Sequence, residues 1–439
     1  MRTARKSIAC IILCLLCMLL PACSNLISMP TQDEQQNYDT DTGLDSPEDN
    51  AEEVRTISFL TPRISSRLEA LAEDIEKDLN IRTEFEILDE ATMQMRIATR
   101  NLSDIYYNQT GALMHSINPE VNAVDLTGEE FADLLAEPFR KVASINSRLY
   151  AVPVMFSANA YIWLYNKQIY NDLELDPPET WDEFMENCQT IAEAGFIPIT
   201  APYQDNWRAQ LILLADAYNI LSVQPDFPAR LTTNQMKYAT TPIALRSFEK
   251  LAGAGRFFDG DYLSITSGES MRRLLDGEAA HFFHSFRSLD DSLDDGTPVT
   301  DVIGYFTQPG DDADDAGVTV WLPDGYFIYK NSPNIELAKE WFAYYLSRER
   351  LESANLGNTQ LVLNLDNDHD NSKSGNLLAE FIRDKRYALA IEFLSPLKGL
   401  DSPSISLDVI SGLFDPFTGA MAFDNDLEKQ AIQLGLPGW

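Results

Sequence analysis

Two hydrophobic periods alternate along the chain after residue 54. Residues 54–60 (VRTISFL) and 82–88 (RTEFEIL) predict β-strands, and the second of these alternates apolar with polar positions. Residues 65–79 repeat apolar positions at helical spacing, residues 93–100 predict another helix, and residues 104–107 (DIYY) predict a short buried strand. This strand–helix–strand–helix–strand order predicts right-handed crossovers and a largely parallel, doubly wound α/β sheet.

Polar turns follow two of these predicted strands. In doubly wound sheets, ligands bind beyond the carboxyl ends of the strands. That rule points to the turns at residues 61–63 (TPR) and 108–111 (NQTG), so Arg63 and Gln109 are candidate ligand contacts. Each also fits a solvated loop position.

A second legible stretch covers residues 149–207. Residues 149–170 form an extended apolar segment that ends in the start of a helix, and residues 181–192 predict a helix capped by Thr180. Cys188 lies on the apolar stripe of that helix, so we expect it to pack in the core rather than react. Gly195 ends the helix, and residues 196–200 (FIPIT) predict a strand.

The first residues of the chain have the layout of a cleaved secretory signal. A basic start precedes an apolar run at residues 8–20, which is too short for a comfortable membrane span. Ala22 and Cys23 then resemble the lipobox of bacterial lipoproteins, although Pro21 departs from its usual pattern. We therefore expect residues 1–22 to be removed and Cys23 to be lipidated. The alternative is an ordinary signal peptide with a chance cysteine.

Residues 23–54 predict a disordered, lipid-anchored spacer. The segment contains no lysine or arginine but is rich in aspartate, glutamate and other polar residues, with little to bury. Its like charges repel one another and extend it. The length of this acidic spacer favours a single-membrane host.

The whole chain is acidic. Its 68 aspartates and glutamates exceed its 33 lysines and arginines, which gives a formal net charge of −35. This balance argues against nucleic acid and polyanions as partners. Because Cys188 is the only cysteine left after cleavage and lipidation at Cys23, no intramolecular disulfide is expected.

Several motifs, in order, resemble the extracellular solute-binding proteins of sugar importers, the maltose-binding-protein-like group. They begin at Tyr150 (YAVP), Leu164 (LYNK), Pro177 (PPETWDEF), Ala194 (AGFIPI) and Asp205 (DNW). Residues 274–283 (LLDGEAAHFF), 303–310 (IGYFTQPG) and 325–346 continue the resemblance, which is weak beyond about residue 365.

The resemblance implies a two-lobed periplasmic-binding-protein-like fold with a ligand cleft between α/β lobes. Residues 55–158 with about 325–365 would form the N-terminal lobe. Residues 159–324 with about 366–439 would form the C-terminal lobe. Three chain crossings, near residues 153–159, 321–325 and 360–370, would serve as the hinge.

Sugars present apolar faces and hydroxyl groups, so their sites need aromatic platforms and short polar groups. By the resemblance, Asp205 and Trp207 match a motif whose tryptophan stacks on a sugar ring. Trp321, Tyr326 and Tyr203 are further candidates at crossing or loop positions. Each of these aromatic residues also fits core packing.

Two more candidates are a residue at the first crossing and a residue that departs from the family pattern. Asn159, like Arg63 and Gln109, is a candidate for contacting hydroxyls. Phe286 stands where the family often has a tryptophan, so it is a candidate replacement platform. Trp163 and Trp181 fit the core better, because both lie in regular apolar patterns.

The resemblance implies a non-enzymatic, monomeric protein that captures a carbohydrate, most simply an oligosaccharide, and needs no cofactor. It would be lipid-anchored on the outer face of the cell membrane and would deliver its ligand to an ABC transporter permease with a cytoplasmic ATPase. A lipid-anchored sugar hydrolase remains an alternative, because many carboxylates are present. A ligand-sensing lipoprotein of a signalling system would share the same fold.

Two sequence patterns hint at metal sites. His281 and His284 are spaced as a pair, but no third ligand is evident. Residues 366–377 imitate the start of a calcium loop but have Asn371 and Leu377 where glycine and glutamate are needed. We therefore expect no metal site.

Overall fold

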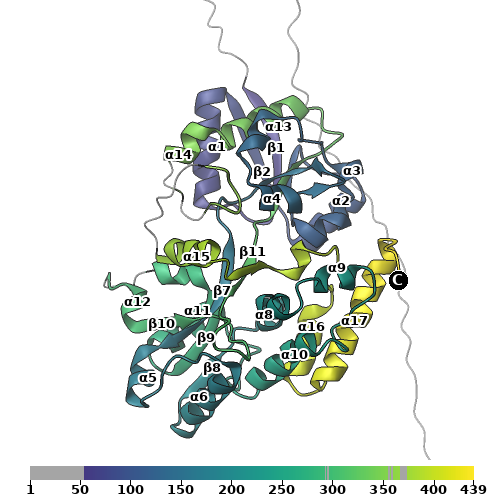
Figure 1. The fold of residues 1–439 in the computed structure, drawn as a ribbon. Coiled ribbons are helices and arrows are strands. Elements are labelled where there is room, and N and C mark those ends of the chain that lie inside the picture. Colours follow the sequence, from purple (N-terminus) through teal and green to yellow (C-terminus); the bar gives the residue numbers. More distant parts are fainter. Residues whose placement is uncertain (1–53, 292, 294–295, 354–355, 357–358, 366–372) are drawn as a thin grey trace, which may run out of the picture. The chain divides into compact units, whose positions relative to one another are not determined.

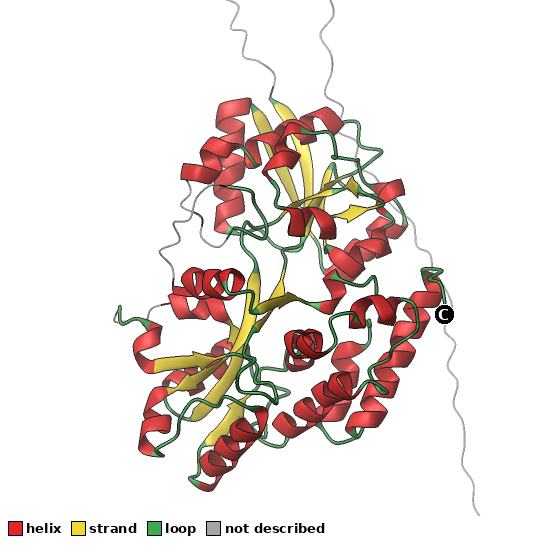
Figure 2. Ribbon diagram, viewed as in Figure 1, coloured by secondary structure: helices red, strands yellow, loops and turns green. Residues whose placement is uncertain are grey.

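The computed structural model describes residues 54–439 apart from 292, 294–295, 354–355, 357–358 and 366–372. The predicted signal peptide, Cys23, nearly all of the predicted spacer and most of the calcium-loop imitation lie outside the described residues. The architecture is mixed α/β, with two larger sheets and helices packed on them (Figures 1 and 2).

The first sheet is largely parallel, as predicted. Strand β1 pairs in parallel with β2 and β3, and β12 runs antiparallel between β3 and β6. The expected strands and helices of this region are confirmed to within a few residues. The sheet order is β2 (Ile81–Ile87), β1 (Arg55–Thr61), β3 (Ile105–Asn108), β12 (Gly325–Ile328) and β6 (Ala151–Pro153).

The second sheet is mixed rather than mainly parallel. Strand β7 runs antiparallel to β9, β10 and β11, while β8 and β13 add parallel edges. Its order is β13 (Tyr387–Leu389), β11 (Val318–Trp321), β7 (Asn159–Asn166), β9 (Ala279–Ser285) and β8 (Ile197–Thr200), with β10 (Ile303–Phe306) on β7. A separate hairpin joins β4 (Ser144–Ile145) to β5 (Arg148–Leu149).

Helices supply the remaining regular structure of the described residues. The α-helices are α1 (Ser66–Leu79), α2 (Glu90–Ala98), α3 (Pro119–Asn122), α4 (Glu137–Val142), α5 (Lys167–Asp172), α6 (Trp181–Glu193), α7 (Leu211–Ala215), α8 (Ala217–Val223), α9 (Phe227–Thr232), α10 (Pro242–Gly255), α11 (Ser267–Leu275), α12 (Val299–Val302), α13 (Ile335–Tyr345), α14 (Arg348–Ser353), α15 (Lys373–Arg383), α16 (Ser402–Ile410) and α17 (Pro416–Gln433). Short 3-10 turns are η1 (Gly111–Ile117), η2 (Glu130–Leu134), η3 (Asn206–Gln210), η4 (Phe286–Asp290) and η5 (Ile391–Phe393).

Helix α6 shows how local sequence sets an element. Thr180 and Glu183 form a reciprocal capping box at its start, and Gly195 follows its end with φ +91°. Its apolar stripe packs inward, and Cys188 is fully buried on it. Trp163 and Trp181 are also buried, which confirms the core positions predicted for them.

The chain passes between the two sheets at two described segments. The first crossing (residues 154–158) leads from β6 in the first sheet to β7 in the second. The second crossing (residues 322–324) leads from β11 back to β12. The Val154 amide donates to the Asp324 carbonyl at 2.9 Å, so the two crossings are bonded to each other.

The third predicted crossing, near residues 360–370, lies partly outside the described residues. Leu363 still forms a bridge with Leu135 on the side of the first sheet. Ser374, at the start of α15, instead donates its amide to Asp290 of η4, which follows β9. The assignment of whole lobes to these chain segments stays a prediction.

Candidate functional site

Three of the predicted or neighbouring polar and aromatic residues meet where β7 begins. Asn159 pairs with Trp321 in the sheet, and its Oδ1 accepts a hydrogen bond from Ser285 Oγ at 2.8 Å. The ring of Tyr161 lies edge-on to Trp321, with 5.3 Å between centroids. Two half-buried aromatic rings therefore stand beside both crossings, an arrangement suited to the apolar face of a sugar.

The indole of Trp321 is held in place by a hydrogen bond to a buried ion pair. Its Nε1 donates to Glu392 Oε1 at 3.1 Å, and Glu392 Oε2 lies 3.5 Å from Lys398 Nζ. Both charged side chains are mostly buried, at 11% and 16% exposure, so this pair fixes the ring more firmly than a surface pair would. Glu392 was not predicted from the sequence.

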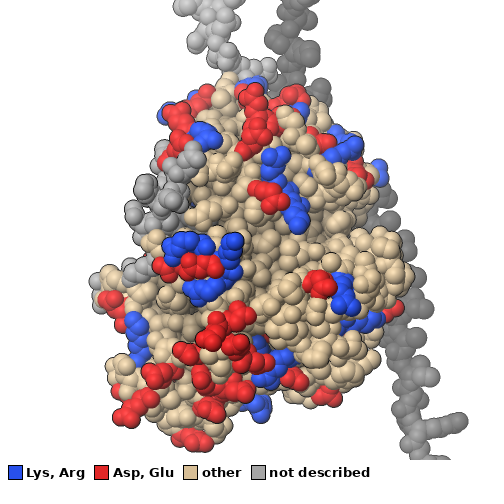
Figure 3. Space-filling model, in the orientation of Figure 1, with Lys and Arg blue, Asp and Glu red and all other residues tan. Residues whose placement is uncertain are grey.

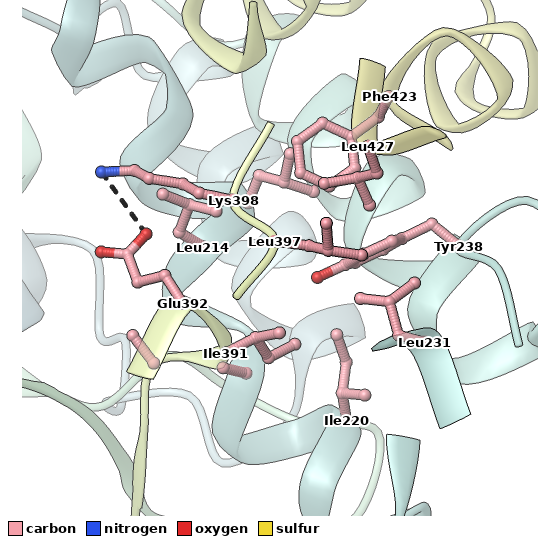
Figure 4. A pocket seen from close by; sticks show the side chains of 13 residues that line it. Leu214, Ile220, Leu231, Tyr238, Ile391, Glu392, Leu397, Lys398, Phe423 and Leu427 are labelled. Carbon is pink, nitrogen blue, oxygen red and sulfur yellow. Dashed lines mark ion pairs between the residues drawn. The ribbon is translucent and has the colours of Figure 1, made fainter. Parts of the chain in front are cut away.

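The Glu392–Lys398 pair also borders a small cavity (Figure 4). Its walls are mostly apolar and come from helices α7, α8, α9 and α17 together with the segment around η5. The cavity has a volume of about 20 Å³, which is room for about one water and not for a sugar. It therefore belongs to the support of the site and not to the site itself.

Residues of the first sheet bind the second crossing. Tyr107 Oη donates to Asp324 Oδ2 at 2.5 Å, and Thr110 Oγ1 donates to the Pro323 carbonyl at 3.0 Å. Gln109 lies half-buried between these two donors in the chain, and Arg63 is exposed in the turn after β1. Because β1 and β3 are parallel, both predicted turns lie at the same end of the sheet, beyond the carboxyl ends of these strands.

Tyr326 is the second residue of β12 and pairs with Tyr107 of β3 near that end of the sheet. Its side chain is 7% exposed and packs edge-on against Phe59, with 4.9 Å between centroids. Burial raises the pKa of its hydroxyl to about 12, and the charge of Arg63 opposes the rise. Tyr326 is thus mainly a core residue, and its hydroxyl interacts electrostatically with Arg63.

The tryptophan motif lies on η3. Trp207 is 42% exposed, and the guanidinium of Arg208 stands 4.6 Å from its ring centroid. Asp205 is exposed and pairs weakly with Arg208, with 3.5 Å between Oδ2 and Nε. A tryptophan that is this exposed contributes little to the core. With a cation against one side of its ring, it is suited to stacking on a ligand.

Two other predicted aromatic residues are closed off in this structure. Tyr203 is 5% exposed and packs edge-on against Phe258 and Tyr262. Phe286 is 2% exposed and belongs to a hydrophobic core cluster that includes residues of both sheets. Their role as ligand contacts stays a prediction, and it would require the side chains to become accessible.

Arginines contribute charge that sequence reasoning did not assign. Burial raises the pKa of the Tyr161 hydroxyl, and the charges of Arg208 and Arg287 oppose that rise. Arg287 directly follows Phe286 and donates to the first crossing through Ser157 and Ala158. Arg287 was not among the candidates predicted from the sequence.

The histidine pair has a structural explanation. His281 is fully buried, with Nε2 2.6 Å from Tyr170 Oη and Nδ1 2.7 Å from the Pro198 carbonyl. Both ring nitrogens are therefore engaged. Among the described residues, no cluster of three or more histidine, cysteine or acidic side chains is placed to hold a metal ion.

No helix within the described ranges is both long and apolar enough to cross a membrane.

Among proteins of known structure, a chitin oligosaccharide binding protein shares 15% identity with this chain, with a TM-score of 0.71. The match covers 86% of this chain and 99% of that protein. A Bacillus licheniformis sugar transporter protein solved with stachyose shares 14% identity with a TM-score of 0.63, covering 85% and 100%. These likenesses establish the two-lobed periplasmic-binding-protein-like fold.

Sequence comparison adds the family. The multiple sugar-binding protein of Streptococcus mutans serotype c is 29% identical over 83 residues, a match that spans 19% of each chain. The family model described as bacterial extracellular solute-binding protein matches residues 61–350, which is more than half of the chain. The protein therefore belongs to the bacterial extracellular solute-binding protein family.

Proposed function

We propose that this protein binds an oligosaccharide beside the two crossings and delivers it to an ABC transporter. The observation that carries the proposal is the grouping of Trp321, Tyr161 and Asn159 where the chain passes between the sheets. Aromatic faces and amide groups in one place are what sugar recognition requires. Relatives named for sugars, chitin oligosaccharides and stachyose support the same ligand class.

The proposal extends to the predicted architecture and location. The two sheets would be the cores of two lobes, with the crossings as the hinge that lets the lobes close on ligand. Lipid on Cys23 would hold the protein, as a monomer, at the outer face of the membrane beside its permease. The protein would bind its ligand and release it unchanged, without enzymatic turnover.

The first experiment is a thermal-shift screen of the mature protein with mono- and oligosaccharides, followed by calorimetric titration of each hit. A ligand that binds only the folded state raises its apparent stability. Saturable binding with the sugar recovered intact supports the proposal. Release of a shorter sugar or of free aglycone from the same ligand would show a hydrolase instead.

Trp207→Ala is expected to weaken binding of a screened oligosaccharide by about tenfold or more, because a stacked aromatic platform contributes on the order of 1–2 kcal/mol. The Tm should change little, since the side chain is 42% exposed. Calorimetric titration and thermal melts of the variant measure both quantities.

Tyr305→Ala is the matched control, because Tyr305 on β10 is equally exposed at 42%. Its affinity for the same oligosaccharide should equal that of the wild type. If Trp207→Ala binds normally but melts far earlier, Trp207 is a packing residue and its assignment to the site is wrong.

A further inference from the structure

A short segment after β13 touches elements of both sheets. Strand β13 pairs in parallel with β11, and the amide of Ala390 donates to the Val320 carbonyl of β11 at 3.0 Å. This pairing brings η5 (Ile391–Phe393) beside Trp321, the last residue of β11. The backbone therefore fixes η5 to the second sheet before any side chain is considered.

The middle residue of η5 holds the indole of Trp321. Glu392 Oε1 accepts the hydrogen bond from Trp321 Nε1 at 3.1 Å, and Glu392 Oε2 lies 3.5 Å from Lys398 Nζ. Because an indole has a single N–H donor, this hydrogen bond sets which way the ring faces. Glu392 is thus a positioning residue for Trp321.

The contact of η5 with the first sheet is made at Gly111, where η1 begins after β3. An added Cβ at Gly111 would lie 2.7 Å from Phe393 Cδ1 and 2.8 Å from the Glu392 carbonyl oxygen, both too short for packed atoms. The absence of a side chain therefore lets η5 rest directly on the turn that follows β3. Glu392 consequently meets this turn with its carbonyl group while its carboxylate holds Trp321.

Candidate ligand residues lie on both sides of this contact. Gln109 is two residues before Gly111 in the same turn of the first sheet. Trp321 stands edge-on to Tyr161 in the second sheet, with 5.3 Å between ring centroids. The contact therefore joins the polar turn of the first sheet to the aromatic pair of the proposed saccharide site.

Neutral groups make this contact in a strongly acidic protein. The chain has a formal net charge of −35, and Figure 3 shows acidic side chains spread over the visible face. Net charge of this size opposes compaction. A phenyl ring and a carbonyl group packed on a glycine hold η5 against η1 by packing rather than by attraction between charges, so the contact is lost once the two elements separate.

We infer that η5 couples the placement of the Trp321 ring to the contact between the two sheets. While η5 rests on Gly111, Glu392 holds the indole ready to stack on a sugar. When the sheets separate, η5 loses this support and the indole is held less firmly. The inference rests on the proposed function and names the segment through which the hinge motion affects recognition. Molecules in which the platform is not in place do not bind, and this lowers the apparent affinity.

The first test needs no ligand. In protein isotopically labelled at tryptophan, hydrogen exchange of the Trp321 indole N–H reports how often its bond to Glu392 opens, and Trp321→Phe assigns its signal. Gly111→Ala changes only the turn of the first sheet, yet it should speed this exchange by about threefold or more, because η5 must move to make room for the Cβ. Phe393→Ala should act in the same direction by removing the ring that rests on Gly111.

Two variants serve as matched controls for these substitutions. Gly435 has φ +65° against +66° at Gly111, but a Cβ there would meet nothing within 4 Å, so Gly435→Ala adds the same backbone strain without the clash. Phe414→Ala removes another half-buried ring, from the turn between α16 and α17. Both controls should leave the exchange of the Trp321 indole unchanged.

Replacements of Glu392 test its role as the link. Glu392→Leu removes the acceptor and should speed the exchange of the Trp321 indole at least as much as Gly111→Ala does. Glu392→Gln keeps an oxygen acceptor, so it should restore most of the protection that Glu392→Leu loses. A residue that only supported the fold would not distinguish these two replacements at the indole.

The second test is calorimetric titration with stachyose, chitotriose and maltotriose. Gly111→Ala and Phe393→Ala should each weaken the binding of whichever of these sugars binds by about fivefold, and Gly435→Ala should not. In a Trp321→Ala background, Phe393→Ala should cost less than about a further twofold, because its effect passes through the ring.

The outcomes separate this inference from the proposed function. If the indole of Trp321 exchanges equally fast in Gly111→Ala and Gly435→Ala, the inference is wrong and the proposed function stands. If none of the three sugars binds but the exchange still responds to Gly111→Ala, the coupling is supported and the proposed ligand class is wrong. If Phe393→Ala weakens binding equally with and without Trp321, η5 does not act through the ring, which also overturns the inference.

Discussion

Replacing Lys250 with methionine is expected to lower the free energy of unfolding by about 3–5 kcal/mol. Lys250 is 1% exposed, and its Nζ donates to Asp216 Oδ1 and to the Pro309 carbonyl, both at 2.8 Å. The substitution leaves the fully buried carboxylate of Asp216 without its counter-charge. Urea unfolding followed by circular dichroism measures the change.

Two further variants make this result decisive. Arg272→Met removes exposed ion pairs with Asp276 and Glu278 and should leave the free energy of unfolding nearly unchanged. Adding Asp216→Asn to Lys250→Met removes the uncompensated charge and should restore part of the lost stability. If Lys250→Met costs no more than Arg272→Met, the buried pair does not stabilise this fold.

Lys250 is bonded to one of the motif residues that carry the resemblance to solute-binding proteins, and several other motif residues also have structural roles. It ties α10 to Pro309, and the next residue, Gly310, accepts a hydrogen bond from the Trp181 amide at 2.8 Å. At Gly304, an added Cβ would lie only 2.3 Å from the ring of Tyr165. These motif residues therefore hold the second sheet and its helices together, so the motifs identify the fold better than the ligand.

The parts of the fold that local pattern predicted are those formed by neighbouring segments. Strands β1, β2 and β3 of the first sheet are joined by crossovers and pair in parallel, so they and their helices follow one another along the chain. The second sheet could not be predicted in this way. Its central strand β7 pairs with β9, β10 and β11, all more than 100 residues later, and no local periodicity encodes such partners.

The candidate site was partly predictable for the same reason. Asn159, Trp321 and Trp207 lie at turns or strand ends that pattern and resemblance could find. Tyr161 was passed over because it lies inside an apolar strand, where an aromatic residue reads as core. Glu392 lies beyond the region of resemblance, and only the fold brings it to Trp321.

Strand β9 carries the other large expected effect, a loss of stability in acid. Burial lowers the pKa of His281 to about 3 and that of His284 to about 4, from an ordinary value of 6.5. The neutral ring of His281 donates from Nδ1 to Pro198 and accepts from Tyr170, so a second proton would break this arrangement. His284 stacks on Phe282, with 4.5 Å between ring centroids, and its Nδ1 has no hydrogen-bond partner.

Below pH 6.5 the unfolded chain therefore binds protons that the folded protein does not. The stability contributed by each histidine is fully present above pH 6.5 and is lost as the pH falls toward its folded-state pKa. The slope approaches about 1.4 kcal/mol per pH unit for each histidine, which amounts to about 2 kcal/mol each at pH 5. Urea unfolding at pH 7, 6 and 5 measures this loss.

His284→Met isolates one histidine from the carboxylates that titrate in the same range, because both proteins share those carboxylates. At pH 7 the variant should be about as stable as the wild type, since it removes a buried nitrogen that has no partner. At pH 5 it should be more stable than the wild type by about 2 kcal/mol. Parallel curves for the two proteins would mean that His284 takes up its proton in the folded state, so burial would not be what sets its charge.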